Sequence, residues 1–302
     1  MNRYVPKHVK LLLRQEVNWG CPVQGCGSPF LSYHHFDPPF AEFTDGQQHD
    51  PDGMIALCLA HAKMADGGSW TKDQLRQMKR FPFLQGGEVA GRLEWLRQDV
   101  ILRFGGLTCV RPKVIVEIAG KPLIWVSRDS GGNMLLNMDI PMSNGTPLLR
   151  MESNDWQVFG SIANLEAVPG GRSIQVEIPT AGFALTMEFR DMSQSELQSA
   201  VESEATESTK RRWIEYKGLL NALPPHLSSI RPSLEEEVEI AKQEAWRPYE
   251  ECIASWPALE VTLTGCLSDP RRIILTPSSL QHQGLLIGDI VIFDCQTAIS
   301  IA

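Results

Sequence analysis

Hydrophobic and polar residues alternate along most of the chain from about residue 108 onward. A two-residue period of this kind is typical of β-strands that bury one face. Turn-forming Gly, Asn, Ser and Pro residues separate the alternating stretches, which are VIVEI (114–118), PLIWVS (122–127), MLLNMDI (134–140), PLLRM (147–151), SIQVEI (173–178) and FALTMEF (183–189). Their regular spacing predicts a β-sandwich, a barrel or a β-solenoid, although no repeat is strict enough to favour the solenoid.

The alternation stops between about residues 192 and 255, where charged and helix-forming sequence takes its place. Strand patterns then return in LEVTLTG (259–265), RRIILTP (271–277) and LLIGDIVIFD (285–294). We therefore expect a helical insertion within one β domain. Its tryptophans are expected to be core or interface anchors, and they are Trp213, Trp246 and Trp256.

The first 85 residues have a different pattern. Thr71 followed by Gln74 is a capping-box pattern, which predicts a helix over 71–79. Gly67 and Gly68 would end a short helix before it.

These patterns predict an α+β protein of two domains. A small domain over 1–85 is followed by a larger, mainly β domain over 86–302. PFLQGG (82–87) is expected to be a linker, and GRLEWLRQDVILRFGG (91–106) a helix or a strand leading into the β domain.

Composition adds limits on location and partners. The chain has 302 residues, of which 43% are hydrophobic and 21% charged, as in soluble globular proteins. No apolar run approaches the ~18 residues of a membrane span, and the N-terminus does not resemble a secretory signal. We therefore expect a cytoplasmic protein that makes no membrane contact.

The charge is uneven along the chain. Its net value is -8, but residues 1–80 hold nine basic and eight acidic side chains. The acidic excess argues against nucleic-acid binding by the whole surface, and it leaves room for a local nucleic-acid site in the N-terminal domain.

Cysteine and histidine gather in the N-terminal domain. Three of the seven cysteines and five of the seven histidines lie within the first 61 residues, and an odd cysteine count argues against a disulfide framework. Cys21 and Cys26 form one close pair, and Cys58 and His61 form another. The alternative, small buried residues with a chance histidine, does not explain paired spacing at both ends. A Cys3His set of this kind predicts a closed, tetrahedral structural Zn²⁺ site.

The stretch SYHHFDPP (32–39) stands between the two metal pairs, and DGMIALCLAH (52–61) follows it. Together these segments resemble the HNH (ββα-metal) endonuclease family, over about residues 18–80. The resemblance implies two strands and a helix that hold one Mg²⁺ or Mn²⁺ ion beside DNA. It implies that His34 is a ligand of that ion and that His35 is the general base of phosphodiester hydrolysis.

Two positions depart from the family pattern. Many HNH sequences read NLIALC, two residues, then HH and AD-G--T--QL, where this chain reads GMIALCLAHAKMADGGSWTKDQL. The resemblance places His61 at the first histidine, on the zinc side, and Ala62 at the second, where the family has its other catalytic metal ligand. The central Asn of the family corresponds to Gly53, or to Asp52 with a shift of one.

Three explanations for Ala62 stay open. A histidine ligand was replaced by alanine through engineering, which leaves an otherwise intact pattern and inactivates the site. Alternatively, another residue completes the metal site, with His49 and Asp66 as the nearest candidates. Finally, the domain is naturally inactive and only binds. We favour the engineered change, and we interpret His49 as a solvated loop histidine and Asp66 as a residue that caps or pairs near a helix end.

The predicted helix over 71–79 also carries a basic face, formed by Lys72, Arg76, Lys79 and Arg80. Side chains at this spacing share one side of a helix. This face would either lie along phosphates or be solvated.

The functional hypothesis is a metal-dependent HNH endonuclease that cuts DNA, joined to a β domain that senses a ligand, binds a protein partner or drives homo-oligomerisation. Prokaryotic chains with such an architecture often serve in defence against phage or plasmids, and this expectation is an analogy. The alternative is a non-catalytic, zinc-stabilised module that binds nucleic acid or protein, with the β domain as an assembly part.

Overall fold

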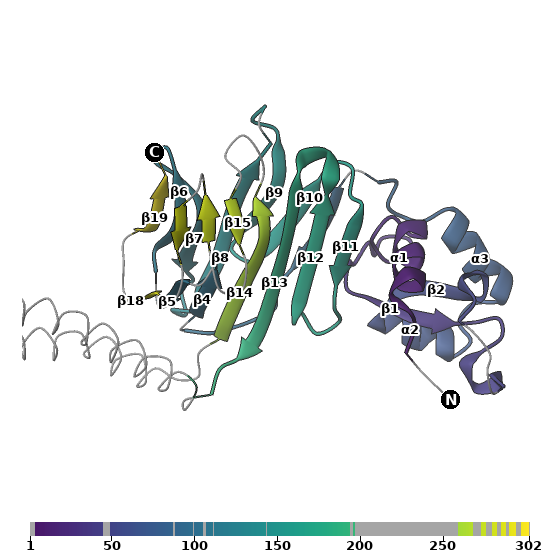
Figure 1. Ribbon diagram of the computed structural model, residues 1–302. Helices are drawn as coiled ribbons and strands as arrows, with labels where there is room; N and C mark the ends of the chain where they lie inside the picture. The colour runs from purple at the N-terminus through teal and green to yellow at the C-terminus, as the bar shows by residue number, and fades with distance from the viewer. Residues whose placement is uncertain are drawn as a thin grey trace, which may run out of the picture.

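The N-terminal part of the chain forms a ββα unit with two further helices (Figure 1). A computed structural model describes residues 4–44, 49–86, 88–98, 100–104, 107–110, 112–142, 144–193, 196, 259–267, 273–275, 280–282, 285–287, 290–293 and 297–301. The N-terminal elements are α1 (Lys7–Glu16), β1 (Leu31–His35), the short 3₁₀ helices η1 (Phe40–Glu42) and η2 (Pro51–Gly53), β2 (Met54–Cys58), α2 (Leu59–Asp66) and α3 (Lys72–Arg80).

Strands β1 and β2 pair antiparallel, and the helices bury their apolar sides against them. Leu31 is opposite Cys58, and His35 is opposite Met54. The apolar cluster of this unit, which we call the head, includes Val9, Leu13, Val17, Leu31, Phe36, Met54, Ile55, Leu57, Ala65 and Leu75. The head therefore has a hydrophobic core of its own.

The rest of the described chain forms two β-sheets. One sheet has the strand order β19-β6-β7-β8-β9-β10-β3. Its strands are β3 (Glu88–Arg92), β6 (Val114–Ile118), β7 (Lys121–Arg128), β8 (Met134–Pro141), β9 (Pro147–Glu152), β10 (Asp155–Phe159) and β19 (Thr297–Ile301).

The second sheet has the order β11-β12-β13-β14-β15-β16-β17, and β4 pairs with β14 and with β5, which in turn pairs with β18. Its strands are β4 (Val100–Phe104), β5 (Leu107–Val110), β11 (Asn164–Ala167), β12 (Ser173–Ile178), β13 (Phe183–Asp191), β14 (Leu259–Leu267), β15 (Ile273–Leu275), β16 (Leu280–His282), β17 (Leu285–Ile287) and β18 (Ile290–Phe293). A 3₁₀ turn, η3 (Pro179–Ala181), joins β12 to β13.

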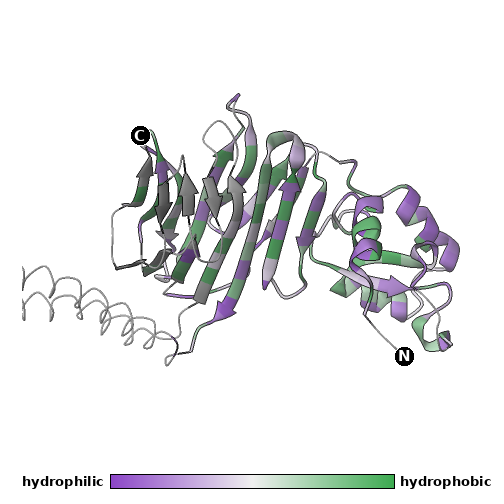
Figure 2. Ribbon diagram, in the orientation of Figure 1, coloured by the Kyte–Doolittle hydropathy of each residue, from purple (hydrophilic) through white to green (hydrophobic). Residues whose placement is uncertain are grey.

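The two sheets share one hydrophobic core, so the β domain is a sandwich. Along β12 and β13 every second residue is buried, and along β8 and β9 most of the apolar residues face the same interior (Figure 2). The largest buried side chains of this core include Trp156 from one sheet and Phe183 from the other. The alternation seen in the sequence is thus the pleat of strands that bury one face.

The expected helical insertion lies outside the described residues, apart from Met192, Ser193 and Glu196, and so do Trp213, Trp246 and Trp256. The strands on either side of it are neighbours, because β13 and β14 pair antiparallel with Asp191 opposite Leu259. The chain therefore leaves the sheet at the end of one strand and returns at the start of the strand beside it.

A buried arginine joins the head to the sandwich. Arg14 of α1 is only 4% exposed. Its guanidinium donates to the Tyr33 hydroxyl at 2.7 Å and to Asn164 Oδ1 at 2.9 Å, and it lies 3.4 Å from a carboxylate oxygen of Glu166. Because Tyr33 belongs to β1 and the other two residues to β11, this one side chain ties the strand of the tandem histidines to the sandwich.

Most sequence predictions of structure hold. The fold is α+β and mainly β, the six alternating stretches are strands, and Thr71 caps α3 in the predicted capping box. The 91–106 segment contains the last two residues of β3 and the whole of β4, and its described residues include no helix. Helix α1 and strands β10 and β11 are additional elements that the pattern analysis did not predict. Within the described parts of the chain, no helix has the length and apolar character needed to cross a membrane.

Candidate metal centre and histidine cleft

The two predicted metal pairs meet at one end of the ββα unit. The ligand atoms of Cys21, Cys26, Cys58 and His61 all lie within 4.8 Å of one another. His61 Nδ1 is 3.3 Å from both Cys21 Sγ and Cys58 Sγ, and the sulfurs of Cys26 and Cys58 are 3.9 Å apart.

This geometry fits a metal ion. A tetrahedron with Zn–S bonds of about 2.3 Å has ligand-to-ligand distances of about 3.5–3.8 Å, close to the spacings found here. Burial raises the pKa of the Cys21 thiol to about 12, and a metal ion bound there would favour the thiolate. The four residues are close enough to bind a metal, and thiolate donors suit Zn²⁺.

Local backbone geometry aims these ligands. The Cys26 N–H donates to the Val23 carbonyl, and Gly25 and Gly27 have φ values of 78° and 62°, so the chain turns back sharply. Left-handed backbone of this kind favours glycine. Cys58 ends β2 and precedes α2, so His61 follows one helical turn later on the same side.

A cleft of about 1060 Å³ lies between β1 and α2, beside the metal cluster. His34 and His35 at the end of β1 line it, together with Ala62 and Asp66 of α2. The structure therefore brings together all three predicted catalytic positions, His34, His35 and Ala62, in one hollow that we call the histidine cleft.

Asp66 faces His34 across this cleft. Asp66 Oδ1 lies 2.9 Å from His34 Nδ1. The His34 side chain is 9% exposed and that of Asp66 is 71% exposed. Desolvation lowers the pKa of His34, and the Asp66 carboxylate opposes this shift. Asp66 follows Ala62 by four residues, so the two share one side of α2.

His35 contacts a second histidine. Its Nε2 lies 2.8 Å from Nδ1 of His49, and its ring packs against Phe40 and Phe43 at centroid distances of 5.4 Å and 5.0 Å. Burial, followed by the nearby His49 and His34, lowers the pKa of His35 to about 4. The interpretation of His49 as a solvated loop residue is therefore wrong. Its partner in β1 is distant in sequence, and no local pattern signals it.

Gly53 is held against the backbone that follows the tandem histidines. A Cβ atom at this position would lie 1.9 Å from the Asp37 carbonyl oxygen. The Gly53 carbonyl accepts hydrogen bonds from the N–H groups of Phe36 and Asp37, at 2.9 Å and 3.1 Å. This close approach requires glycine, so the asparagine of the resembling family has no place here without a shift of the chain.

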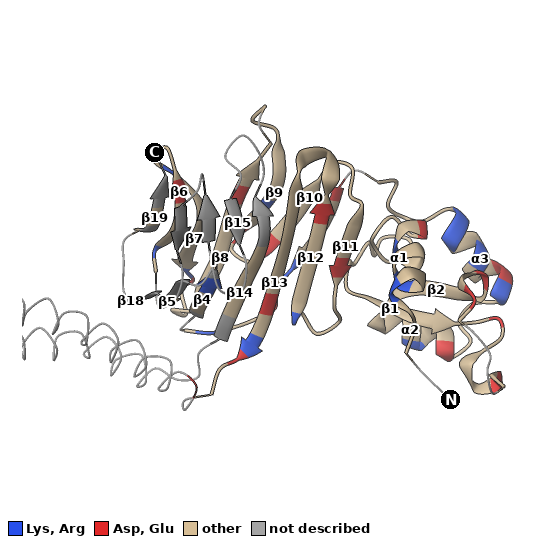
Figure 3. Ribbon diagram, viewed as in Figure 1, with Lys and Arg blue, Asp and Glu red and all other residues tan. Residues whose placement is uncertain are grey.

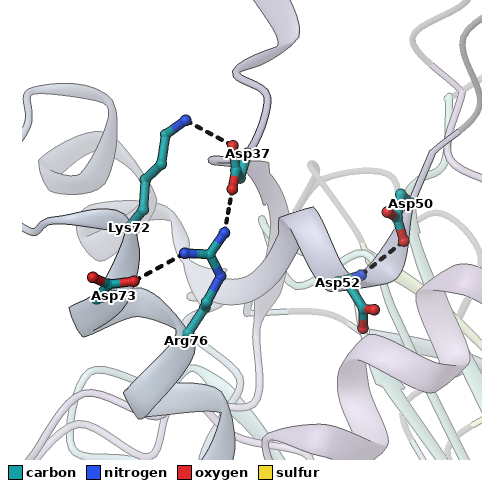
Figure 4. A network of polar contacts seen from close by, with 6 residues as sticks. All are labelled: Asp37, Asp50, Asp52, Lys72, Asp73 and Arg76. Carbon is teal, nitrogen blue, oxygen red and sulfur yellow. Dashed lines mark hydrogen bonds and ion pairs between the residues drawn. The ribbon is translucent and has the colours of Figure 1, made fainter.

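The basic face of α3 is neutralised within the head. Lys72 Nζ donates to one carboxylate oxygen of Asp37 at 2.7 Å, and the Arg76 guanidinium pairs with the other (Figure 4). Arg76 also pairs with Asp73 at 3.0 Å. Lys79 lies 3.0 Å from a carboxylate oxygen of Glu16 and donates to the Pro51 carbonyl.

Lys79, whose side chain is 10% exposed, is therefore not part of a solvated face, whereas the side chains of Lys72 and Arg76 remain 51% and 38% exposed. The expectation that this face lies along phosphates stays a prediction. The charge view shows basic residues on α3 with acidic residues close by (Figure 3). The sequence analysis missed Asp37, whose position just after the tandem histidines was its only signal.

Comparison with known proteins assigns no family. No family model, curated protein or solved structure matches this chain.

Proposed function

We propose that the head is an HNH-type nuclease that hydrolyses DNA phosphodiester bonds with the help of a divalent cation. The observation that carries this proposal is the contact between His34 and Asp66 across the histidine cleft, with His35 beside it. An imidazole and a carboxylate that converge from a strand and a helix form a pair of ligands in a hollow open to substrate.

His34 and Asp66 would hold Mg²⁺ or Mn²⁺, and the remaining positions would be taken by water and substrate phosphate. Such an ion supplies charge stabilisation for the phosphate. This assignment makes Asp66 the residue that completes the site, and it removes the need for a histidine at position 62. It corresponds to the second of the three explanations for Ala62.

His35 is the proposed general base. Its Nε2 faces His49 Nδ1 at 2.8 Å, so one of these two nitrogens donates to the other and the ring orientation is held. The lowered pKa of His35, about 4, leaves its ring neutral at pH 7, so a ring nitrogen has a lone pair with which to accept a proton from water. His49 is accordingly a positioning residue for His35.

We assign Zn²⁺ to the Cys3His cluster, where it serves structure rather than chemistry. Cys58 and His61 stand at the junction of β2 and α2, and Ala62 and Asp66 lie further along the same helix. The cluster therefore anchors the start of the helix that carries Asp66. A closed set of four protein ligands leaves no position for a substrate.

Two positions favour the alternative, a zinc-stabilised module that binds DNA or protein without cutting. Ala62 offers no ligand atom to the cleft. Gly53 excludes the asparagine that the resemblance calls for.

A supercoiled-plasmid nicking assay with Mg²⁺ or Mn²⁺ separates the two functions. The full-length chain is compared with His35→Ala and with Ala62→His. We expect the chain as it stands to nick DNA, and His35→Ala to be slower by at least ~100-fold. Cutting by Ala62→His alone would keep the nuclease and overturn the assignment of Asp66 as a sufficient second ligand. If neither the unchanged chain nor Ala62→His cuts DNA, and DNA is still retained in a gel-shift assay, the head is a binding module.

A further inference from the structure

A second hollow is lined by Phe30, which directly precedes β1 of the head, and by residues of the sandwich. Its volume is about 910 Å³, and we call it the arginine groove. Three segments far apart in sequence form it: residues 92–97 after β3, residues 170–172 before β12, and residues 189–191 at the end of β13. Its walls include Arg92, Trp95, Arg97, Arg172, Phe189 and Arg190.

The groove concentrates positive charge in an acidic chain. Four arginines line it together with the carboxylates of Glu94 and Asp191, although the whole chain has a net charge of -8. Two further carboxylates outside the lining, Asp155 and Glu196, pair with Arg92 and Arg190. A smaller hollow of about 430 Å³ shares Arg172, Phe189 and Arg190 with the groove and adds Arg103 and Glu188. Clustered like charges in a concave surface attract a ligand of opposite sign.

The arginines differ in how they are engaged. Arg97 pairs with Asp191 at 3.0 Å, Arg92 pairs with Asp155 at 2.8 Å, and Arg190 pairs with Glu196 at 2.7 Å, all at sites with exposed carboxylates. Exposed ion pairs of this kind are weak, so a phosphate group can compete for their guanidinium donors. Among the described residues, the side chain of Arg172 has no hydrogen-bond or ion-pair partner, and it is exposed where the two hollows meet.

An aromatic wall stands beside these charges. Trp95 is half-buried and meets Phe189 at a centroid distance of 5.0 Å and an interplanar angle of 83°, which fixes the orientation of its ring. Trp95 Nε1 and Arg97 Nε are buried donors that have no acceptor among the described residues.

We propose that the arginine groove binds a free nucleotide, with its phosphates between Arg172 and Arg190 and its base against Trp95. Guanidinium groups match phosphate oxygens in geometry and charge, and an indole offers a flat surface to a base. A volume of about 910 Å³ is within the range of small-molecule sites. The proposal rests on the sandwich and its junction with the head, and it does not require that the head cut DNA.

The arginine groove is connected to the histidine cleft through strand β1. Phe30 lines the groove, forms a β-bridge with Ala167 of β11, and directly precedes β1. His34 and His35 stand at the far end of that five-residue strand. A nucleotide in the groove would therefore contact Phe30, the residue just before β1, and β1 carries His34 and His35 at its other end.

Isothermal titration calorimetry on the full-length, zinc-loaded chain tests the proposal, with ATP, pyrophosphate and adenosine as probes. We expect ATP to bind, and each of the other two to bind at least tenfold more weakly. Arg172→Ala should weaken ATP binding at least tenfold and leave adenosine binding unchanged, whereas Arg172→Lys should lose less. Trp95→Leu should weaken ATP and adenosine binding together, and leave pyrophosphate binding unchanged.

Arg150→Ala is the matched control, because Arg150 is an exposed arginine on β9 that lies 3.5 Å from Asp139 and does not line the groove. It should bind ATP as the unchanged chain does. Absence of ATP binding at millimolar concentration would overturn the proposal. So would ATP binding that survives both Arg172→Ala and Trp95→Leu, or affinity for pyrophosphate equal to that for ATP. Tighter, Arg172-dependent binding of a single-stranded oligonucleotide would make the groove a strand-binding site instead.

Discussion

Asp66 Oδ1 lies 2.9 Å from His34 Nδ1, so the last residue of α2 and the penultimate residue of β1 face each other across the histidine cleft. Neither residue is near the other in sequence, and the antiparallel pair β1–β2 with the following helix brings them together. If the head holds a divalent cation as proposed, Asp66 is the carboxylate that would bind it together with His34.

Asp66→Ala should therefore lower the rate of metal-dependent nicking by at least about 100-fold. Asp66 is 71% exposed, so its loss should leave the melting temperature nearly unchanged. Asp73→Ala is the matched control, since Asp73 is an exposed carboxylate of α3 that contacts Arg76 and does not line the cleft. Equal nicking by Asp66→Ala and the unchanged chain would contradict the assignment.

Removal of zinc should unfold the head and spare the sandwich. The head core is separate from the core of the two sheets, and the cluster joins the Cys21 loop to the start of α2. Mass spectrometry should find one equivalent of zinc, and Cys58→Ser should lower that content. Hydrogen exchange after chelation should show rapid exchange in β1 and β2 and retained protection in β12 and β13.

Cys109→Ala tests whether this effect is specific, because Cys109 is a buried cysteine of β5 outside the cluster. The Cys109→Ala variant should contain as much zinc as the unchanged chain. Protection of β1 and β2 that survives complete zinc removal would show that the cluster does not hold the head together.

Gly53→Asn should destabilise the head by about 3 kcal/mol, at the upper end of the cost of overpacking. Its Cβ would lie 1.9 Å from the Asp37 carbonyl oxygen, so the backbone at position 53 or at Asp37 must move. Gly67→Ala is the control, because its Cβ would make ordinary contacts of 3.4 Å and 3.6 Å. Denaturant unfolding followed by a head-specific probe would measure both, and equal midpoints would contradict the prediction.

Acid should weaken the head through Asp37. Hydrogen bonding from Lys72, with the nearby Arg76 charge, lowers the pKa of this carboxyl below its usual 3.8. A depressed folded-state pKa gives stability that is present above the unfolded value and is lost as the pH falls through the folded value. Asp37→Asn should be less stable than the unchanged chain at pH 7, and the difference should shrink below about pH 4. Thermal melts over pH 3–7 would show this, and a difference that does not change with pH would contradict it.

The stability of the junction between the head and the sandwich should depend on the hydroxyl group of Tyr33. Tyr33→Phe removes the acceptor that receives a 2.7 Å hydrogen bond from Arg14, whose guanidinium is buried. The expected loss is about 1–3 kcal/mol, the cost of a buried donor without its partner. Tyr4→Phe, at a tyrosine that is 57% exposed, should cost much less. Equal stability of the two variants in chemical unfolding would contradict this role.

Much of the local structure follows from short stretches of sequence. Six alternating segments became strands, because burial on one face of a pleated sheet imposes a period of two. Thr71 and Gln74 began α3, and the spacings of Cys21 with Cys26 and Cys58 with His61 were enough to identify the metal cluster. Each of these signals acts over a few residues, where the backbone geometry is nearly the same in any fold.

The contacts within the candidate site depend on the tertiary structure alone. Asp66 opposes His34, His49 meets His35, and Asp37 neutralises the basic face of α3, each across a distance in sequence that no local pattern encodes. The arginine groove likewise draws its walls from residues 92–97, 170–172 and 189–191. The sequence by itself determined the strands, the helix caps and the cysteine spacing. Only the packing of β1 against α2, and of the head against the sandwich, decided which charged side chains neutralise one another and which face an open hollow.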